Sequence, residues 1–399
     1  MRLLVFGMIG RCPFGGQTWL SLNWLRGFQQ LGHDVWYVED DNTWPYDPVH
    51  RTVTDNCSYA VKHIAACMER IGLSSNWAFR FGGRSGTCWG VSNRQLDELY
   101  RSCDVLFTFG TADLREEHLA APLRIYIESD PVMSQLRLAG GDERTREAFE
   151  AHHKIFTYGE NYDAPDCGVP LCGIDYGKTR QPIDLGLWTF NFDPQARFVT
   201  TIGNYRQDGN DVEFNGEVYR WSKHHEWIKF MDLPRRTSQE FELGVFPDDP
   251  ADRQRLDSNG WRLFSPYDMS LDTFGAYPAF IRNSRAEFTV AKDQNVRLRS
   301  GWFSERDACY LASGKPVIAQ DTGFSNILPT GEGLFAFSTS DEAVAAIDAI
   351  NVDYERHCRA ARAIAEEYFE ASSVARRLLE QVDRSQPAKH EEVSNLQRR

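Results

Sequence analysis

The residues best suited to chemistry lie between 284 and 323, where an apolar strand, a cationic loop, a helix start and a second strand follow one another. Lys292, Arg299 and Arg306 are cations, and Ser304 is placed to cap the helix in a capping box with Asp307. Cations beside the free backbone N–H groups of a helix start suit the two phosphates of a nucleoside diphosphate. The turn before the helix and the end of the second strand add further predicted contacts, because ligands bind at the carboxyl ends of parallel strands: Gly301, Asp321, Thr322 and Gly323.

A further cation follows an apolar strand that starts at residue 197. Arg206 ends the segment 203–206 (GNYR), directly after this strand. Its position predicts that the side chain reaches the same strand-end edge and contacts the diphosphate. A solvated surface arginine is the alternative interpretation.

A candidate general base stands at the end of another strand. The apolar run 123–127 is followed by Glu128, Ser129 and Asp130, and Pro131 then ends the strand. A carboxylate at a strand end that faces a cleft can take a proton from a hydroxyl group, and Asp130 is the best placed candidate. The alternative is that Asp130 only caps the next turn or helix.

A glycine-rich loop follows the first apolar strand and precedes a helical segment. It contains Gly15, Gly16 and Gln17, but no lysine in the position that a P-loop requires. The loop can let a ligand approach the backbone closely, or it can serve only to pack the helix against the sheet. His224 and His225 are adjacent on a helical segment and point in different directions, and the cysteines form no CxxC pair, so we predict no metal site.

Four segments resemble those of a known family. Residues 306–318 (RDACYLASGKPVI) are similar to the helix, turn and strand at which the C-terminal domain of bacterial GT-B glycosyltransferases binds a nucleotide-sugar donor. Residues 331–334 (GEGL) resemble the glycine-rich turn that follows. The loop at Gly15 and Gly16 and the segment 31–35 (LGHDV) are similar to the opening of the acceptor domain.

The resemblance implies a GT-B fold, in which two Rossmann-like domains with parallel sheets face a central cleft. It implies transfer of a sugar from a nucleotide-diphosphate sugar, the co-substrate, to a small molecule, natural product or glycan, with no metal or other cofactor. The residues named above would hold the donor, and Gly15, Gly16 and Gln17 would lie on the acceptor side.

One departure from the family leaves the stereochemistry open. Retaining members carry two glutamates eight residues apart, and Gly301 and Cys309 occupy those positions here. Glu305 and Asp307 are the nearby acids that could replace the ribose-binding glutamate, and Asp130 would be the base if the reaction inverts. A nucleotide-sugar epimerase of the same architecture and a non-catalytic nucleotide- or sugar-binding protein remain as alternatives.

The composition sets the class of protein. The chain has 399 residues, 42% of them hydrophobic, which is enough for two or three globular domains at about 150 residues each. Its net charge of −13 argues against general binding to nucleic acid. We see neither a signal peptide nor an apolar run of about 18 residues that could span a membrane, and the nine scattered cysteines indicate a reducing cytoplasm. The oligomeric state is open.

The alternation of short apolar strands with helices predicts an α/β protein with parallel sheets. Residues 166–196 are rich in proline, glycine and aspartate and show no sustained period, so we expect a linker there. The predicted organisation is an acceptor domain (1–165), this linker (166–196), a donor domain (197–350), C-terminal helices that can pack back on the first domain (351–383) and a disordered tail (384–399).

Overall fold

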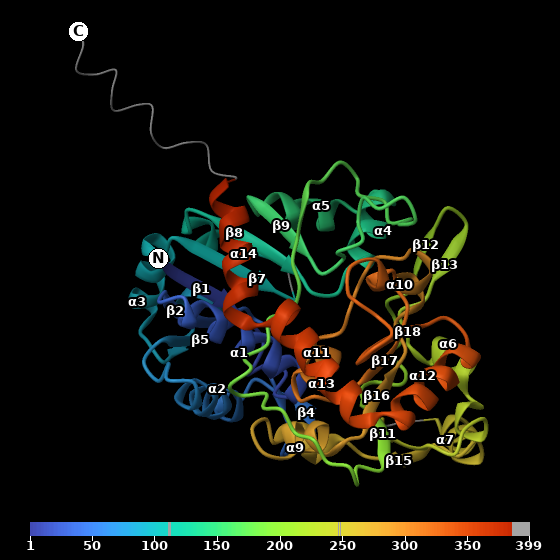
Figure 1. Cartoon of the computed structure of the whole chain (residues 1–399). Coiled ribbons are helices and arrows are strands. Elements are labelled where there is room, and N and C mark those ends of the chain that lie inside the picture. Colours follow the sequence, from blue (N-terminus) through green and yellow to red (C-terminus); the bar gives the residue numbers. More distant parts are fainter. Residues whose placement is uncertain (111–112, 246, 248, 385–399) are drawn as a thin grey trace, which may run out of the picture.

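The computed structural model describes residues 1–384 apart from 111, 112, 246 and 248, and it contains two large sheets with helices on their faces (Figure 1). The first sheet has eight strands in the order β10-β9-β8-β7-β1-β2-β5-β6. Neighbouring strands are parallel except for β5 and β6. The strands are β1 (Arg2–Phe6), β2 (Asp34–Asp40), β5 (Trp77–Phe81), β6 (Thr87–Trp89), β7 (Val105–Phe109), β8 (Arg124–Glu128), β9 (Lys154–Thr157) and β10 (Tyr176–Lys178).

The second sheet has six parallel strands in the order β15-β14-β11-β16-β17-β18. These strands are β11 (Phe198–Ile202), β14 (Glu240–Gly244), β15 (Arg262–Phe264), β16 (Ala286–Thr289), β17 (Val317–Gln320) and β18 (Leu334–Phe337). The two sheets form two Rossmann-like domains that face each other across a central cleft.

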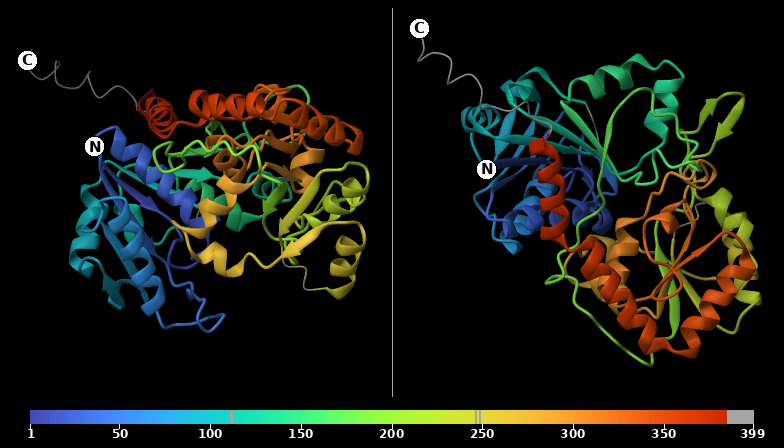
Figure 2. Two further views of the ribbon diagram at one scale, coloured as in Figure 1. Left: turned by 60° about the horizontal axis from the view of Figure 1, so that its bottom comes forward. Right: turned by 45° about the horizontal axis from the view of Figure 1, so that its top comes forward.

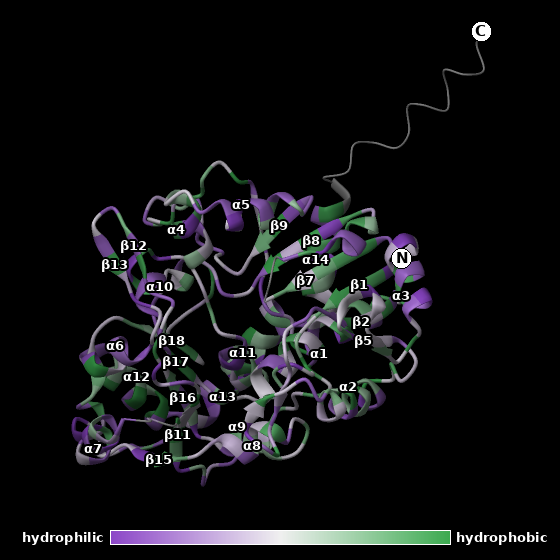
Figure 3. Cartoon of the chain, turned by 180° about the vertical axis from the view of Figure 1, so that it is seen from behind, coloured by the Kyte–Doolittle hydropathy of each residue, from purple (hydrophilic) through white to green (hydrophobic). Residues whose placement is uncertain are grey.

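Both faces of the parallel strands are covered, because the helices that connect them lie on the two sides of the sheet. All five residues of β7 (VLFTF) are buried, and so are four of the five residues of β1 (RLLVF). Near-continuous apolar runs of this kind are typical of strands with helices on both sides. The hydrophobic colour of the strands in the interior of both domains is visible in Figure 3.

Helices connect the strands and cover the sheets. The helices α3 and α12 begin with capping boxes at Ser92 and Thr339. In each box the side chain of the N-cap residue accepts a hydrogen bond from the backbone N–H three residues on, and the side chain of that residue accepts one from the N-cap N–H. The helices are α1 (Gly15–Gln30), α2 (Ser58–Arg70), α3 (Asn93–Ser102), α4 (Met133–Ala139), α5 (Glu143–Glu150), α6 (His224–Trp227), α7 (Pro250–Ser258), α8 (Tyr267–Leu271), α9 (Ala276–Asn283), α10 (Asp293–Arg297), α11 (Glu305–Ala312), α12 (Ser340–Val352), α13 (Tyr354–Ile364) and α14 (Ala371–Arg384).

Two small hairpins extend from the domains. The first is β3 (Tyr46–Asp47) with β4 (Thr52–Val53), and the second is β12 (Val212–Phe214) with β13 (Glu217–Tyr219). Tyr219 of the second hairpin lies in one apolar cluster with Leu136 of α4, so this hairpin of the second domain packs on the first.

The last helix returns to the first domain. In both views of Figure 2, α14 (red) lies beside the first domain after α13 has crossed the second. The backbone of α14 approaches α1 so closely that a Cβ atom on Gly27 would lie 2.6 Å from the carbonyl oxygen of Ala371. Glycine at this position therefore permits the contact between the two helices.

The segment expected to be a linker, residues 166–196, contains a short strand. It contains β10, which pairs with β9 and forms the edge of the first sheet. Three residues are too few to show a strand period, and so the sequence pattern missed them. The rest of the expected tail, 385–399, lies outside the described residues. Within the described part of the chain, no helix is long and apolar enough to cross a membrane.

Candidate active site

A cavity of about 640 Å³ lies between the two sheets, at the carboxyl ends of their strands. Loops that follow β1, β8 and β9 form one wall, and loops that follow β11 and β15 form the other together with the start of α11. Ligands bind at this edge in doubly wound α/β folds. The cavity is lined by Cys12, Phe14, Gly16, Gln17, Leu20, Arg51, Ser129, Asp130 and Tyr158 of the first domain, and by Ile202, Gly203, Asn204, Tyr205, Arg206, Ser265, Pro266, Tyr267, Ser270, Tyr277, Trp302, Ser304, Glu305 and Arg306 of the second.

The cavity brings together only part of the set predicted from the sequence. The predicted residues that line it are Gly16, Gln17, Asp130, Arg206, Ser304 and Arg306. The predicted residues that are not among its lining are Gly15, Lys292, Arg299, Gly301, Asp321, Thr322 and Gly323.

Gly15 belongs to the contact between the domains. A Cβ atom at this position would lie 2.6 Å from the ring of Tyr277 on α9, so only glycine lets the second domain approach here. The helix α1 starts at Gly15, and the residue before it, Phe14, provides no side-chain cap. The first N–H groups of α1, beside Gly16 and Gln17, therefore remain available at the cavity wall.

Asp130 stands where the two domains meet. Its Oδ2 forms an ion pair with Lys292 of the second domain, and its Oδ1 is buried without a hydrogen-bond partner. The adjacent Ser129 carbonyl oxygen accepts a 3.0 Å hydrogen bond from the indole N–H of Trp302. Asp130 does not cap α4, whose N-cap residue is Val132. The unsatisfied oxygen leaves this carboxylate able to accept a hydrogen bond from a ligand.

Lys292 is paired with Asp130, and its role at a diphosphate stays a prediction. Its Nζ lies 3.0 Å from the ring centroid of Trp221 and it is buried. Burial lowers the pKa of Lys292, and Asp130 opposes this effect. The charge of Lys292 is thus largely compensated within the protein.

The turn that carries Asp130 is strained and held in place from below. Val132 has a φ of 89°, which is rare for a β-branched residue. Its N–H donates to Oε1 of Gln135 at 2.7 Å, and Nε2 of Gln135 donates to both carboxylate oxygens of Glu128 at 3.0 and 2.9 Å. Burial raises the pKa of Glu128 to about 7, although the hydrogen bonds from Gln135 and Thr157 favour the charged form. This buried network fixes the position of Ser129 and Asp130.

Arg206 lines the cavity but is already paired on one side. Its guanidinium group bonds to both oxygens of Asp252 and, at 2.9 Å, to Nε2 of His224. Burial lowers the pKa of His224 to about 4, so at neutral pH this ring is uncharged and accepts the hydrogen bond. The side chain of Arg206 is still 34% exposed, and it can turn a free edge toward the cavity.

Arg306 forms part of the cavity floor and is used by the protein itself. It donates to the carboxylate of Glu287, to the carbonyl oxygen of Ile202, to Oγ1 of Thr289 and to Asp307. Direct contact with a diphosphate, as the sequence suggested, would require Arg306 to give up these bonds. Its position instead ties α11 to β11 and β16 under the cavity.

The start of α11 presents free N–H groups to the cavity. Ser304 is the N-cap residue as predicted, but its side chain makes no capping hydrogen bond, so the predicted capping box with Asp307 does not form. The first-turn N–H groups therefore have no side-chain acceptor, and an anion can take that place.

Lys223 was missed in the sequence and stands beside the cavity. Its Nζ lies 5.3 Å from the ring centroid of Trp302, and no ion pair or hydrogen bond of this amine is found within the described residues. Burial and then the nearby charge of Arg306 lower the pKa of Lys223 to about 7. The hairpin of β12 and β13 lies between Arg206 and Lys223 along the chain. No local sequence pattern therefore indicated that the two cations lie at the same site.

Arg299 belongs to a contact between the domains, and its role at the diphosphate stays a prediction. Its Nε donates to Asp166 at 2.7 Å and its Nη1 to Asp321 at 3.0 Å. The carbonyl oxygen of Arg299 accepts a 2.8 Å hydrogen bond from Nδ2 of Asn161. Asp321 is therefore occupied by Arg299 and by the N–H of Gly323.

The two glycines of this region serve the same contact. A Cβ atom on Gly301 would lie 2.3 Å from the backbone nitrogen of Asn161, and one on Gly323 would lie 2.7 Å from its side-chain nitrogen. Thr322 completes the contact, because its Oγ1 donates to the carbonyl oxygen of Trp302 at 2.6 Å and its own carbonyl oxygen accepts from Gly301 at 2.7 Å. Both glycines are needed because the loop at Asn161 passes against the backbone.

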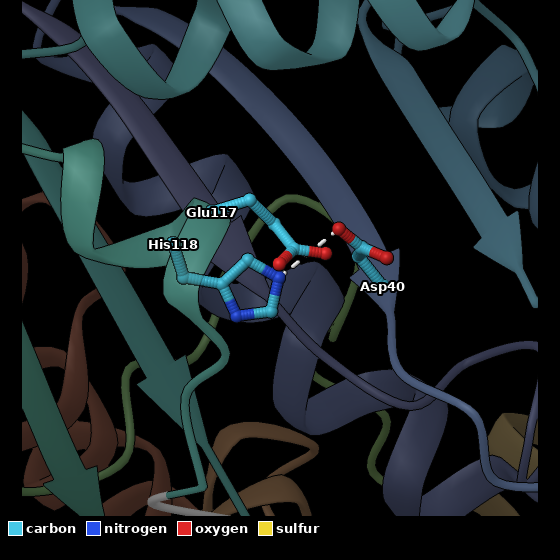
Figure 4. Close-up of side chains that lie close together, drawn as sticks. All are labelled: Asp40, Glu117 and His118. Atoms are coloured by element: carbon cyan, nitrogen blue, oxygen red, sulfur yellow. Dashed lines mark hydrogen bonds and ion pairs between the residues drawn. The ribbon is translucent and has the colours of Figure 1, made fainter. Parts of the chain in front are cut away.

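Asp40, Glu117 and His118 lie close enough together that they could hold a metal ion, and Figure 4 shows the three side chains near one another. The carboxylate of Asp40 is, however, already bonded to Arg80 at 2.6 and 2.9 Å and to His118 at 3.0 Å. Burial opposes its ionisation, but the hydrogen bonds from His118 and Arg80 outweigh burial and hold the pKa of Asp40 well below its usual value. A metal ion would meet the guanidinium group of Arg80, so this cluster is a charge network of the fold.

Comparison with solved structures shows that the chain has the GT-B fold. It aligns with an alpha-glucosyltransferase in complex with UDP and a 13-mer DNA, at 12% identity and a TM-score of 0.58 over 96% of this chain and 100% of the other. It aligns equally well with Anabaena HepE in complex with UDP-glucose, at 12% identity and a TM-score of 0.58 over 96% and 100% of the two chains.

A glycosyltransferase from Rickettsia africae aligns at 11% identity and a TM-score of 0.56, over 96% of this chain and 98% of that one. No family model and no curated protein sequence matches the chain. The similarity of this chain to these glycosyltransferases is therefore a similarity of fold and not of sequence.

Proposed function

We propose that this protein is a glycosyltransferase that transfers a sugar from a nucleotide-diphosphate sugar to a hydroxyl group of an acceptor. The observation that carries the proposal is the cavity between the carboxyl edges of two Rossmann-like sheets, with a cationic, uncapped helix start on one wall and an unsatisfied carboxylate on the other. The solved structures of the same fold that hold UDP or UDP-glucose support a donor of this class.

In this proposal the second domain binds the donor. The free N–H groups at Ser304 and the cations Arg206 and Lys223 face the diphosphate, and Arg306 adds positive charge from below. As the sugar leaves, negative charge grows on the diphosphate, and these fixed donors stabilise it without a metal ion. Residues Lys292, Arg299, Gly301, Asp321, Thr322 and Gly323 hold the walls of the site in place.

The first domain binds the acceptor, at Gly16, Gln17 and the start of α1. Asp130 is the base if the reaction inverts, since its Oδ1 is free of protein partners and its turn is rigid. We also propose a cytoplasmic location, because all nine cysteines are free and so indicate a reducing environment.

The proposal is tested by the binding of UDP and UDP-glucose, measured by calorimetry and by the shift in melting temperature. Lys223→Ala removes a cation without breaking an ion pair, and we expect it to weaken the binding of both compounds about tenfold, as for loss of one charged hydrogen bond. Lys62→Ala, on an exposed face of α2, is the matched control and should have no effect. If the wild-type protein binds no nucleoside diphosphate and no nucleotide sugar, the proposal is wrong.

A further inference from the structure

Glu305 is a carboxyl group in the cavity wall without a cation beside it. It is the first residue of α11, and its Oε1 accepts a 3.0 Å hydrogen bond from Nδ2 of Asn23. Within the described residues, neither an ion pair nor any second hydrogen bond to this carboxyl group is found. Arg306, the next residue along the chain, turns away to the carboxylate of Glu287.

The orientation of Asn23 decides which oxygen of Glu305 carries a proton. Asn23 is fully buried on α1, and its Oδ1 accepts a 3.0 Å hydrogen bond from the backbone N–H of Asp184. A backbone N–H can only donate, so the amide is fixed with its NH₂ group toward Glu305. Oε1 is therefore the accepting oxygen, and a proton on the carboxyl group would sit on Oε2.

Among the described residues, the titratable groups that interact with Glu305 are two tyrosines and a cysteine, while the charged Arg306 nearby is paired with Glu287. Tyr158 follows β9, Tyr277 lies on α9 and Cys309 lies one turn further along α11, and burial raises the pKa of each of them. Burial likewise raises the pKa of Glu305 well above its usual value, and only the hydrogen bond from Asn23 opposes this. The helix start favours a carboxylate, but that effect is small compared with the loss of water around an unpaired charge.

A charged Glu305 would also conflict with its neighbourhood. Ser304 and the free N–H groups of α11 are the part of the cavity proposed for the diphosphate, one residue away. A carboxylate there would repel the phosphates, whereas a neutral carboxylic acid would not and would still offer one O–H donor.

We propose that Glu305 is a neutral carboxylic acid that donates its Oε2–H to a hydroxyl oxygen of the transferred sugar and so helps to select that sugar. The inference rests on the proposed function, since it places the sugar of the donor beside the start of α11. Glu305 binds the substrate in this role and takes no proton from it.

Two substitutions separate a neutral acid from a carboxylate. Glu305→Gln keeps an acceptor for Asn23 and a donor toward the cavity, whereas Glu305→Leu keeps only the approximate size. By calorimetry at pH 7, we expect Glu305→Gln to bind UDP-glucose within about threefold of the wild type and Glu305→Leu to bind it about tenfold more weakly, as for loss of one hydrogen bond. Both variants should bind UDP like the wild type, because UDP lacks the sugar.

The pH dependence gives a second reading. The wild-type protein should lose affinity for UDP-glucose, relative to UDP, as the pH rises through the pKa of Glu305, and Glu305→Gln should not. Difference infrared spectra should show a protonated carboxyl band in the wild type at pH 7 that is missing in Glu305→Gln. The infrared measurement requires neither a bound ligand nor enzyme activity.

The outcomes distinguish the inference from the proposed function. If the wild type binds UDP-glucose but Glu305→Gln loses it as Glu305→Leu does, a carboxylate is required and the inference is wrong. A missing infrared band would overturn it as well. If the wild type binds neither UDP nor UDP-glucose, the sugar contact and the proposed function both fail, and the infrared band alone then decides the protonation of Glu305.

Discussion

At the scale of single residues, the candidate site is built from charges that belong to different domains. Asp130 of the first domain is paired with Lys292 of the second, while its Oδ1 has no partner. The amine of Lys223 lies over the ring of Trp302, and burial followed by the charge of Arg306 lowers its pKa to about 7. The site thus combines an ion pair that holds Asp130 in place with polar groups, Oδ1 of Asp130 and the amine of Lys223, that can bind a ligand.

The role of Asp130 is open to a direct test. If the reaction inverts, Asp130→Asn should lower the rate of UDP release from UDP-glucose about a hundredfold or more, as for loss of a general base. Binding of UDP-glucose should fall much less than the rate, because Asn keeps the shape of the side chain although it loses the charge that pairs with Lys292. Stopped assays of UDP release and calorimetry measure the two quantities, and Asp104→Asn, on the loop before β7, is the control. A variant with the full rate would exclude Asp130 as the base.

At the scale of elements, a buried charge network holds the edge of the first domain together. Asp40 ends β2, Arg80 lies on β5, Tyr100 lies on α3, and His118 lies on the short 3-10 helix η2 (Glu116–Ala120). Asp40 and Arg80 are both fully buried, and such pairs are costly to break because one charge is left alone.

We therefore expect Asp40→Asn to lower the free energy of unfolding by about 3–5 kcal/mol. The stability that Asp40 provides is present above its usual pKa and is lost as the pH falls, because its pKa is lower in the folded state than in the unfolded chain. The acid sensitivity of Asp40→Asn should thus be smaller than that of the wild type. Urea denaturation at pH 7 measures the loss of stability, and a series that continues below the usual Asp pKa of 3.8, down to about pH 2, measures the difference in acid sensitivity.

The matched control is the exposed pair Arg94 and Glu98 on α3, whose side chains are 89% and 62% exposed. Glu98→Gln should change the free energy of unfolding by less than about 1 kcal/mol, since water screens such pairs. A cost for Asp40→Asn as small as this would show that the network does not stabilise the domain.

At the scale of the whole molecule, contacts between distant segments determine how the two domains sit. The loop at Asn161 and Asp166 meets the second domain at Arg299, Gly301 and Gly323, and α14 returns to α1. These contacts hold the two domains against each other, and the shape of the cavity between the domains depends on their relative position.

Substitutions at two glycines distinguish the effect of the close contact at Asn161 from the effect of backbone strain. Gly301 and Gly331 both have a positive φ, of 83° and 100°, but only Gly301 has a neighbour in the way of a Cβ atom. Gly331→Ala should cost about 1–2 kcal/mol of stability from strain alone, and Gly301→Ala about 1–3 kcal/mol more. Urea denaturation measures the costs, and small-angle scattering should show a larger radius of gyration for Gly301→Ala. Equal costs would mean that the contact with Asn161 gives way easily.

The sequence by itself determined the class of fold. Runs such as VLFTF in β7 and the helical period between them are local patterns, and a parallel α/β architecture follows from them because each strand must be covered on both faces. The glycine loop at 15–17, the strand end at Asp130 and the helix start at Ser304 were located for the same reason, since each is marked by neighbouring residues.

Only the tertiary structure decided which of the predicted cations are free. Arg299 meets Asp166 across 133 residues, and Lys292 meets Asp130 across 162 residues, so neither pairing leaves a mark near the cation itself. Among the residues that the structure describes, Lys223 forms no ion pair with a carboxylate, and this too depends on contacts between distant segments. A local pattern reports burial and element type, whereas the availability of a charge depends on which distant side chain the fold brings within hydrogen-bonding distance.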